Sequence, residues 1–139
     1  MTRVLFVCVK NGGKSQMAAG LFRHAVADDP DPGRWQVESV GTQAGSKLNG
    51  LSVEVLAEVG VDISDQQPRQ LTPELQQSAD VVVTVGEADV DPLPGPVYET
   101  WQIDEPSLRG IDGPERMRLV RDDIDRHVED LHQRLTATD

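Results

Sequence analysis

The sequence predicts a three-layer α/β/α domain built on a four-stranded parallel sheet. Short apolar runs rich in valine alternate along the 139 residues with segments whose apolar residues recur every three or four positions. This alternation of strands and helices is typical of a parallel sheet that is covered by helices on both faces. The length fits one compact unit, so we expect residues 1–139 to form a single domain.

The first half of the chain predicts a strand–helix–strand unit. Its elements are, in order, a strand over 3–8, a loop over 9–14, a helix over 15–27, a turn over 28–34 and a strand over 35–40. The first strand is apolar throughout, as expected for a strand buried on both faces. Ser15 is a favourable residue for starting the helix. The second strand ends at Gly41.

The second half predicts two further strands and the helices that cover them. Its elements are a helix over 48–59, a helix that begins at Thr72-Pro73, a strand over 80–85, a proline-rich loop over 91–96, a strand over 97–103 and a long helix over 117–135. Gly60 is a typical helix C-cap. Thr72 is a typical N-cap, because Pro73 then takes the first helical position.

The charge balance is strongly acidic. Thirteen Lys and Arg against 24 Asp and Glu give a net charge of −11, which disfavours nucleic acid and anionic membranes as partners. The chain has only three lysines, Lys10, Lys14 and Lys47, and two of them lie in one short loop. No apolar run approaches the roughly 18 residues of a membrane helix. The N-terminal apolar run is too short for a signal peptide, so we expect a cytoplasmic protein.

Cys8 is the only cysteine. A single cysteine forms no internal disulfide, and it rules out mechanisms that need a second cysteine in the chain. The same count excludes zinc sites built from cysteines. The three histidines show no ligand spacing, so we expect no metal site and place them on helix surfaces.

The loop that follows Cys8 predicts an oxyanion site. Successive amides ahead of a helix can point inward as an anion nest, and glycines let the backbone curl. Lys14 and the helix dipole add positive charge, which favours the thiolate of Cys8, and the Ser15 hydroxyl can donate to that sulfur. The predicted oxyanion-binding residues are Val9, Lys10, Asn11, Gly12, Gly13, Lys14 and Ser15, with Asn11 also supporting the loop. Cys8 is therefore a candidate nucleophile; the alternative is a buried cysteine beside an ordinary turn.

Three segments of the chain carry a family resemblance. Cys-x5-basic-Ser over 8–15, directly after the first strand, resembles the loop of low-molecular-weight tyrosine phosphatases, in which the basic residue is normally Arg. Ser-Val-Gly-Thr over 39–42 is similar to a segment after the second strand of that family. Trp-Gln-Ile-Asp-Glu-Pro over 101–106 looks like the loop that supplies its general acid. The resemblance implies a low-molecular-weight phosphatase-like fold.

The resemblance also implies roles for three further side chains. Glu105 takes the place of the family's general acid, and its neighbour Asp104 is a rival for the same role. For both carboxylates the alternative is a solvated acidic turn. Ser39 looks like the hydroxyl that braces the oxyanion loop from the second strand.

The chain departs from a tyrosine phosphatase in ways that resemble another branch of the superfamily. Lys14 replaces the usual Arg and cannot make a planar two-pronged contact with an oxyanion, and Ser107 and Leu108 replace aromatic residues that flank a phenyl ring. Segments that resemble actinobacterial arsenate–mycothiol transferases lie at 11–18, 51–54, 57–60, 105–106 and 115–118.

That second resemblance implies an arsenate reductase that acts as an arsenate–mycothiol transferase. Cys8 would attack arsenate, mycothiol would take over the arsenic as co-substrate, and a mycoredoxin-type glutaredoxin-like protein would complete the reduction. The resemblance implies no tightly bound cofactor. Arg69 is a candidate contact for the thiol. Two alternatives remain open, a phosphatase acting on proteins or small molecules and a non-catalytic oxyanion-binding protein.

Overall fold

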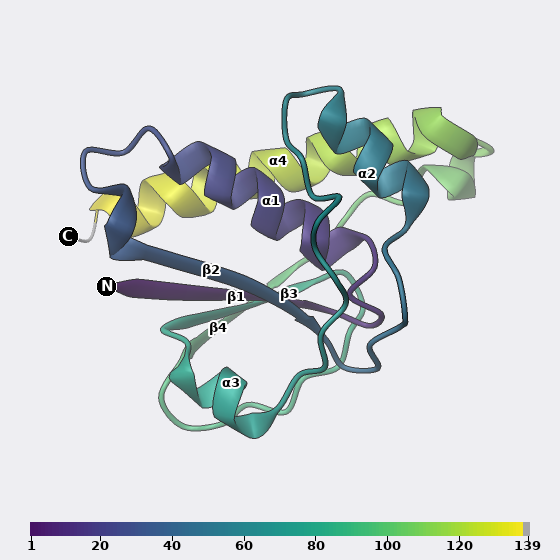
Figure 1. Ribbon diagram of the computed structural model, residues 1–139. Coiled ribbons are helices and arrows are strands. Elements are labelled where there is room, and N and C mark those ends of the chain that lie inside the picture. The colour runs from purple at the N-terminus through teal and green to yellow at the C-terminus, as the bar shows by residue number, and fades with distance from the viewer. Residues whose placement is uncertain (138–139) are drawn as a thin grey trace.

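The computed structural model describes residues 1–137 and confirms the four-stranded parallel sheet (Figure 1). The strands are β1 (Thr2–Cys8), β2 (Trp35–Gly41), β3 (Val81–Val85) and β4 (Val97–Trp101). Their order is β2-β1-β3-β4, and every neighbouring pair is parallel. The chain moves from β1 to β2 on one side and then crosses to β3 on the other. The strand order therefore reverses beside the end of β1, which is where open α/β sheets bind ligands.

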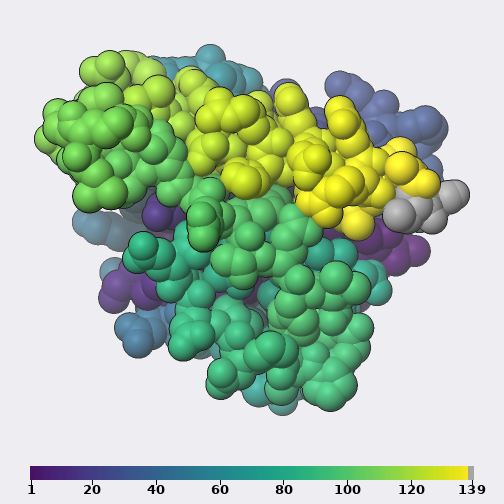
Figure 2. All heavy atoms as spheres, turned by 180° about the vertical axis from the view of Figure 1, so that it is seen from behind, coloured from purple at the N-terminus to yellow at the C-terminus, as the bar shows by residue number. Residues whose placement is uncertain are grey.

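Helices cover both faces of the sheet. The α-helices are α1 (Lys14–Val26), α2 (Gly50–Ala57), α3 (Pro73–Ser78) and α4 (Gly113–Ala137), and the 3-10 helices are η1 (Pro32–Arg34) and η2 (Pro106–Arg109). Figure 1 shows α1, α2 and α4 on one face and the short α3 on the other. Seen from behind, α4 lies across the molecule as an exposed ridge (Figure 2). Within residues 1–137, no helix is long and apolar enough to cross a membrane.

Two apolar clusters fill the space between these layers. The larger cluster lies between the sheet and helices α1 and α4. In it, Phe6 of β1 and Phe22 of α1 are fully buried with ring centroids 5.8 Å apart. The smaller lies on the α3 side and includes Leu5 and Val7. Because successive β1 residues point to opposite faces, both sides of this strand are buried, as the apolar run predicts.

The predicted caps of two helices are confirmed, and one is wrong. Thr72 accepts a hydrogen bond from the Leu75 amide at the start of α3, and Gly60 has the left-handed φ of +81° expected after α2. Ser15 does not start α1. The helix begins at Lys14, and its N-cap is Gly13, which has no side chain to make a cap bond. Ser15 already lies inside the helix, where its hydroxyl contacts the sulfur of Cys8.

Several element boundaries also differ from the sequence expectation. The helix α4 begins at Gly113, four residues before the predicted start, and β4 ends at Trp101 rather than at residue 103. Two histidines of α4 are packed rather than lying on its surface. His127 stacks on Trp101, and His132 lies with its Nε2 3.0 Å from Oδ1 of Asp29.

Candidate active site

Cys8 lies at the carboxyl end of β1, and its sulfur is held by two neighbours. The Asn11 amide donates to Sγ over 3.2 Å, and the Ser15 hydroxyl lies 2.8 Å from the same atom. The Ser15 oxygen also accepts from the Asn11 side-chain amide at 2.7 Å, so its single proton remains for the sulfur or for the Val40 carbonyl at 3.4 Å. When Cys8 is a thiolate, the shorter contact becomes a hydrogen bond to a negative charge, which favours that form.

Asn11 organises the loop from the inside, as predicted. It is fully buried, and its φ of +55° is the only left-handed backbone of a non-glycine residue within 1–137. Asn tolerates this conformation better than most residues do. Its Oδ1 accepts from the Gln16 side chain at 3.1 Å and from the Arg69 amide at 2.9 Å, while its Nδ2 donates to Ser15. The residue therefore ties both ends of the loop to a distant segment of the chain.

The backbone after β2 supplies the outer brace of the loop. Amides of Thr42, Gln43 and Gly45 donate to the carbonyls of residues 8, 9 and 10 over 3.0, 2.8 and 2.9 Å. A Cβ on Gly41 would lie 2.6 Å from the Val9 carbonyl oxygen, so only glycine permits this close approach. The predicted brace from the Ser39 hydroxyl is wrong: Ser39 is buried, but its hydroxyl makes no hydrogen bond within the described residues.

Gln16 is a support that the sequence prediction missed. It is 1% exposed, and its Nε2 donates to Asn11 Oδ1 and to the Gln67 carbonyl. Its Oε1 has no hydrogen-bond partner among residues 1–137. The only signal in the sequence was a polar residue on the helix beside the loop, a pattern that a solvent-facing glutamine gives equally well.

Lys14 extends from the loop across the end of β3. A Cβ on Gly86 would lie 3.3 Å from Lys14 Nζ, so the lysine runs directly over this glycine. No ion pair joins Lys10, Lys14 or Lys47 to a carboxylate within the part of the chain that the structure describes. The loop therefore keeps an uncompensated positive charge in a chain of net charge −11. The side chains of Val9 and Lys10 are exposed, so these two residues contribute to the loop through their backbone.

The two candidate acids are held as carboxylates by arginines. Glu105 makes a paired contact with Arg116 at 2.7 and 2.6 Å and accepts from Ser107, and the Arg116 hydrogen bonds lower the pKa of Glu105 to about 2. Asp104 pairs with Arg109 at 2.7 and 3.0 Å, which lowers its pKa as well. Neither carboxyl carries a proton to donate at neutral pH in this arrangement, so the predicted acid role of Glu105 requires Arg116 to release it.

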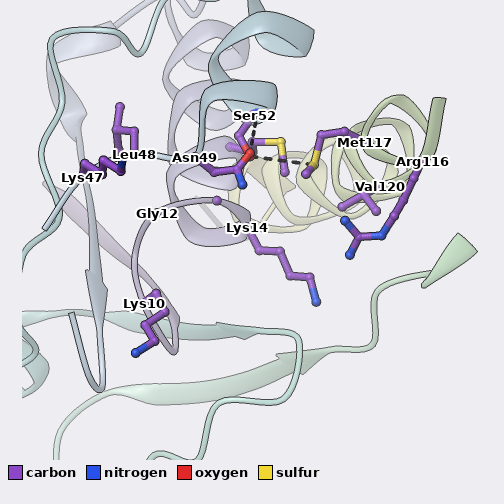
Figure 3. Close-up of a pocket in the computed structure, with 12 residues that line it drawn as sticks. Lys10, Gly12, Lys14, Lys47, Leu48, Asn49, Ser52, Arg116, Met117 and Val120 are labelled. Atoms are coloured by element: carbon purple, nitrogen blue, oxygen red, sulfur yellow. Dashed lines mark hydrogen bonds between the residues drawn. The ribbon is translucent and has the colours of Figure 1, made fainter. Parts of the chain in front are cut away.

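A pocket of about 390 Å³ opens beside the loop, between the segment before α2 and the start of α4. Its cationic residues are Lys10, Lys14, Lys47 and Arg116, and its apolar residues are Met17, Leu48, Met117 and Val120. None of the 12 lining residues is aromatic. Figure 3 shows Lys14 and Arg116 extending toward the same open space, with Lys10 and Lys47 on the opposite side of Gly12.

The pocket wall is fixed to the oxyanion loop. The Asn49 amide donates to the Gly12 carbonyl at 2.7 Å, and Asn49 Oδ1 accepts from the amide and the hydroxyl of Ser52. The Ser52 hydroxyl also lies 3.7 Å from Met117 Sδ, which links α2 to α4. Arg69 does not line this pocket; its side chain is more than half exposed and lies 3.6 Å from Glu38. Within residues 1–137, no group of three or more His, Cys, Asp or Glu is placed to hold a metal ion.

Comparison with known proteins agrees with this geometry. An arsenate reductase of Shouchella clausii is 36% identical over 132 residues, which cover 90% of this chain and 91% of the relative. A glutaredoxin arsenate reductase of Synechocystis is 30% identical over 135 residues, 94% of this chain and 96% of the relative.

Solved structures show the same architecture. A thioredoxin-dependent arsenate reductase of Corynebacterium glutamicum superposes with a TM-score of 0.81 and 32% identity over all of this chain, which spans 64% of that longer chain. An arginine phosphatase of Geobacillus stearothermophilus shares the fold with a TM-score of 0.72 at 21% identity, over 99% of this chain and 95% of that one. The family model "Low molecular weight phosphotyrosine protein phosphatase" matches residues 3–139. The cysteine-based oxyanion loop at the end of β1 and this match over nearly the whole chain show that the protein belongs to the low molecular weight phosphotyrosine protein phosphatase family.

Proposed function

We propose that this protein is an arsenate reductase that acts as an arsenate–mycothiol transferase. The observation that carries the proposal is a lone cysteine inside an oxyanion loop, in a chain of 139 residues that holds no second cysteine. Relatives named arsenate reductase, at 30–36% identity, support arsenate as the substrate. The sulfur that removes the arsenic from Cys8 must then come from another molecule, and the resemblance to the actinobacterial transferases favours mycothiol.

The first step is attack by the Cys8 thiolate on arsenic. A sulfur–arsenic bond forms, an arsenic–oxygen bond breaks, and the oxygen leaves as water after taking up protons; arsenic stays pentavalent. The loop amides and Lys14 neutralise the negative charge on the remaining oxygens. Ser15 donates to the sulfur before the attack and again when Cys8 leaves, so its hydroxyl serves both halves of the reaction.

The second step is transfer of the arsenic to mycothiol. The mycothiol thiolate attacks arsenic, the bond to Cys8 breaks, and Cys8 recovers its electron pair as a thiolate. The product is a conjugate of mycothiol with pentavalent arsenic. Reduction to arsenite follows on a separate mycoredoxin-type protein, whose thiolate attacks the sulfur of the conjugate; the electron pair of the sulfur–arsenic bond passes to arsenic, and the two sulfurs are oxidised to a disulfide.

The family membership makes phosphate ester hydrolysis the second candidate activity. Two features of the site disfavour it. Lys14 is a point charge that cannot grip two oxygens as Arg does. The pocket beside the loop offers no aromatic side chain to flank a phenyl ring.

An omission series tests the proposal. Arsenate turnover is measured with mycothiol, mycoredoxin and the mycoredoxin-reducing system, and each component is left out in turn. We expect no arsenite when mycothiol or mycoredoxin is absent. Hydrolysis of a chromogenic phosphate ester without thiol, combined with no arsenate turnover, would establish a phosphatase instead. Tight arsenate binding with neither activity would establish a non-catalytic oxyanion-binding protein.

A further inference from the structure

We propose that the pocket between the oxyanion loop, the segment before α2 and the start of α4 is the docking site of a small, oxygen-rich thiol, held by Lys47 and Lys10. The proposal rests on the proposed function, because an external thiol is needed only if Cys8 hands its arsenic onward. It adds where that thiol binds and which side chains select it.

The position of the pocket suits the second substrate. Gly12, Gly13 and Lys14 belong to the oxyanion loop and also form the pocket wall, so a molecule bound there lies against the loop that holds the arsenate. A volume of about 390 Å³ lies within the range of small-molecule sites and far exceeds what one oxyanion fills. Gly12 lets the loop pack closely against the segment before α2, because a Cβ there would lie 3.2 Å from the Lys47 carbonyl oxygen.

The chemistry of the pocket indicates the class of ligand. All three lysines of the chain line it, although the protein carries a net charge of −11. Several arginines elsewhere are neutralised by carboxylates, for example Arg118 and Arg121 by Glu58. Ammonium groups left unpaired beside a cavity suit oxygen acceptors on a ligand.

The two ends of the pocket suit the two ends of such a thiol. Lys14, at the end of the oxyanion loop nearer Arg116, lies where the thiolate must arrive, while Lys10, from the start of the same loop, and Lys47 lie on the opposite side of Gly12 (Figure 3). Leu48 and Met117 supply apolar contact for the carbon skeleton between them. The oxygens that Lys47 contacts are either sugar hydroxyls, as in mycothiol, or carboxylates, as in glutathione.

The methionines provide a direct readout of ligand binding in the pocket. The chain has three: Met17 and Met117 line the pocket, whereas Met1 is 81% exposed at the start of the chain. Full-length protein labelled with ¹³C at the methionine methyl groups is titrated with S-methylmycothiol and, separately, with S-methylglutathione, neither of which can attack arsenic. We expect saturable shifts of the Met117 and Met17 signals and no shift of Met1.

Lys47→Gln tests the selecting residue. Lys47 is exposed and outside the oxyanion loop, so we expect an unchanged fold and a dissociation constant raised about two- to tenfold, as for the loss of one ordinary hydrogen bond at an exposed position. Gln133→Glu is the matched control, because it also lowers the net charge by one unit, at an exposed position near the far end of α4. If Lys47→Gln weakens binding of the glutathione derivative more, Lys47 contacts carboxylates of the ligand. If it weakens binding of the mycothiol derivative equally or more, Lys47 contacts hydroxyls.

Two results would overturn the inference. One is the absence of Met117 shifts with both derivatives at millimolar concentration, while phosphate still protects Cys8 from alkylation. The other is an unchanged affinity for both derivatives in Lys47→Gln. Failure of the proposed function looks different, since arsenate turnover would then be absent in the omission series whatever the titrations show.

Discussion

Two loops meet the substrate side of this fold, and they are built in opposite ways. The oxyanion loop over 8–15 is held by neutral hydrogen bonds around the fully buried Asn11. The loop over 104–109 is held by ion pairs of partly exposed carboxylates, Glu105 with Arg116 and Asp104 with Arg109. Buried neutral networks fix one geometry, whereas exposed ion pairs are weak and exchangeable. The first loop is therefore suited to hold the nucleophile rigidly, and the second to rearrange around a ligand.

The largest expected effect comes from the centre of the rigid loop. Cys8→Ser should abolish arsenate turnover and leave the fold intact, because the loss of a nucleophile costs several powers of ten. Thiol-dependent arsenate turnover and the circular dichroism spectrum are measured on the same preparation. Residual turnover above about 1% of wild type would contradict the covalent mechanism.

Asn11 tests whether the neutral network sets the geometry. Asn11→Gly keeps the left-handed φ but loses three side-chain hydrogen bonds, so we expect a loss of about 2 kcal/mol in the free energy of unfolding and about a hundredfold loss of turnover. Asn11→Ala should cost about 1 kcal/mol more, because alanine is strained at this φ.

Urea unfolding and turnover measure both Asn11 variants. Thr72→Ala is the control, since it removes a helix cap on the opposite face of the sheet and should cost about 1 kcal/mol of stability with no loss of turnover. Full turnover in Asn11→Gly would show that the glycine-rich backbone alone shapes the loop.

Lys14→Arg tests what limits phosphatase chemistry in the same loop. Arginine offers a planar fork to two oxygens of the transition state, so phosphate ester hydrolysis without thiol should rise about tenfold, with about a hundredfold as the upper limit. Thiol-dependent arsenate turnover should change less, because arsenate needs only positive charge and a sulfur nucleophile. An unchanged rate of ester hydrolysis in Lys14→Arg would indicate that the 104–109 loop, and not Lys14, limits phosphatase activity.

The smallest effect is expected in the exchangeable loop, and it depends on pH. The pKa of Glu105 is lowered from 4.5 to about 2 in the folded protein, so its pair with Arg116 stabilises the fold above pH about 4.5. That contribution is lost as the pH falls toward 2. Glu105→Gln should therefore reduce the free energy of unfolding by about 1 kcal/mol at neutral pH, as for a partly exposed pair, and by much less near pH 2. Urea unfolding at several pH values measures this, and a pH-independent difference would contradict the ion-pair account.

The two loops also differ in how far the sequence predicts them. The nest over 8–15 is predictable because glycine, asparagine and the strand-to-helix turn act locally. Its outer brace is not, since the amides of Thr42, Gln43 and Gly45 reach the loop through tertiary contacts. Nothing in the sequence shows that the Ser39 hydroxyl takes no part in this brace. The 104–109 loop was predicted to hold an acid, but Arg116 lies 11 residues away on a helix that begins earlier than its apolar pattern indicates. Long-range ion pairs leave no periodic signal in a sequence.

The identity of the arsenic product made without mycoredoxin tests the central claim most directly. Wild-type enzyme, arsenate and mycothiol are incubated together, and arsenic species are separated and identified by mass spectrometry. The account predicts a conjugate of one mycothiol with pentavalent arsenic, formed only when Cys8 is present, and no arsenite. Arsenite formed by the enzyme without mycothiol, or a conjugate that forms equally well with Cys8→Ser, would contradict it.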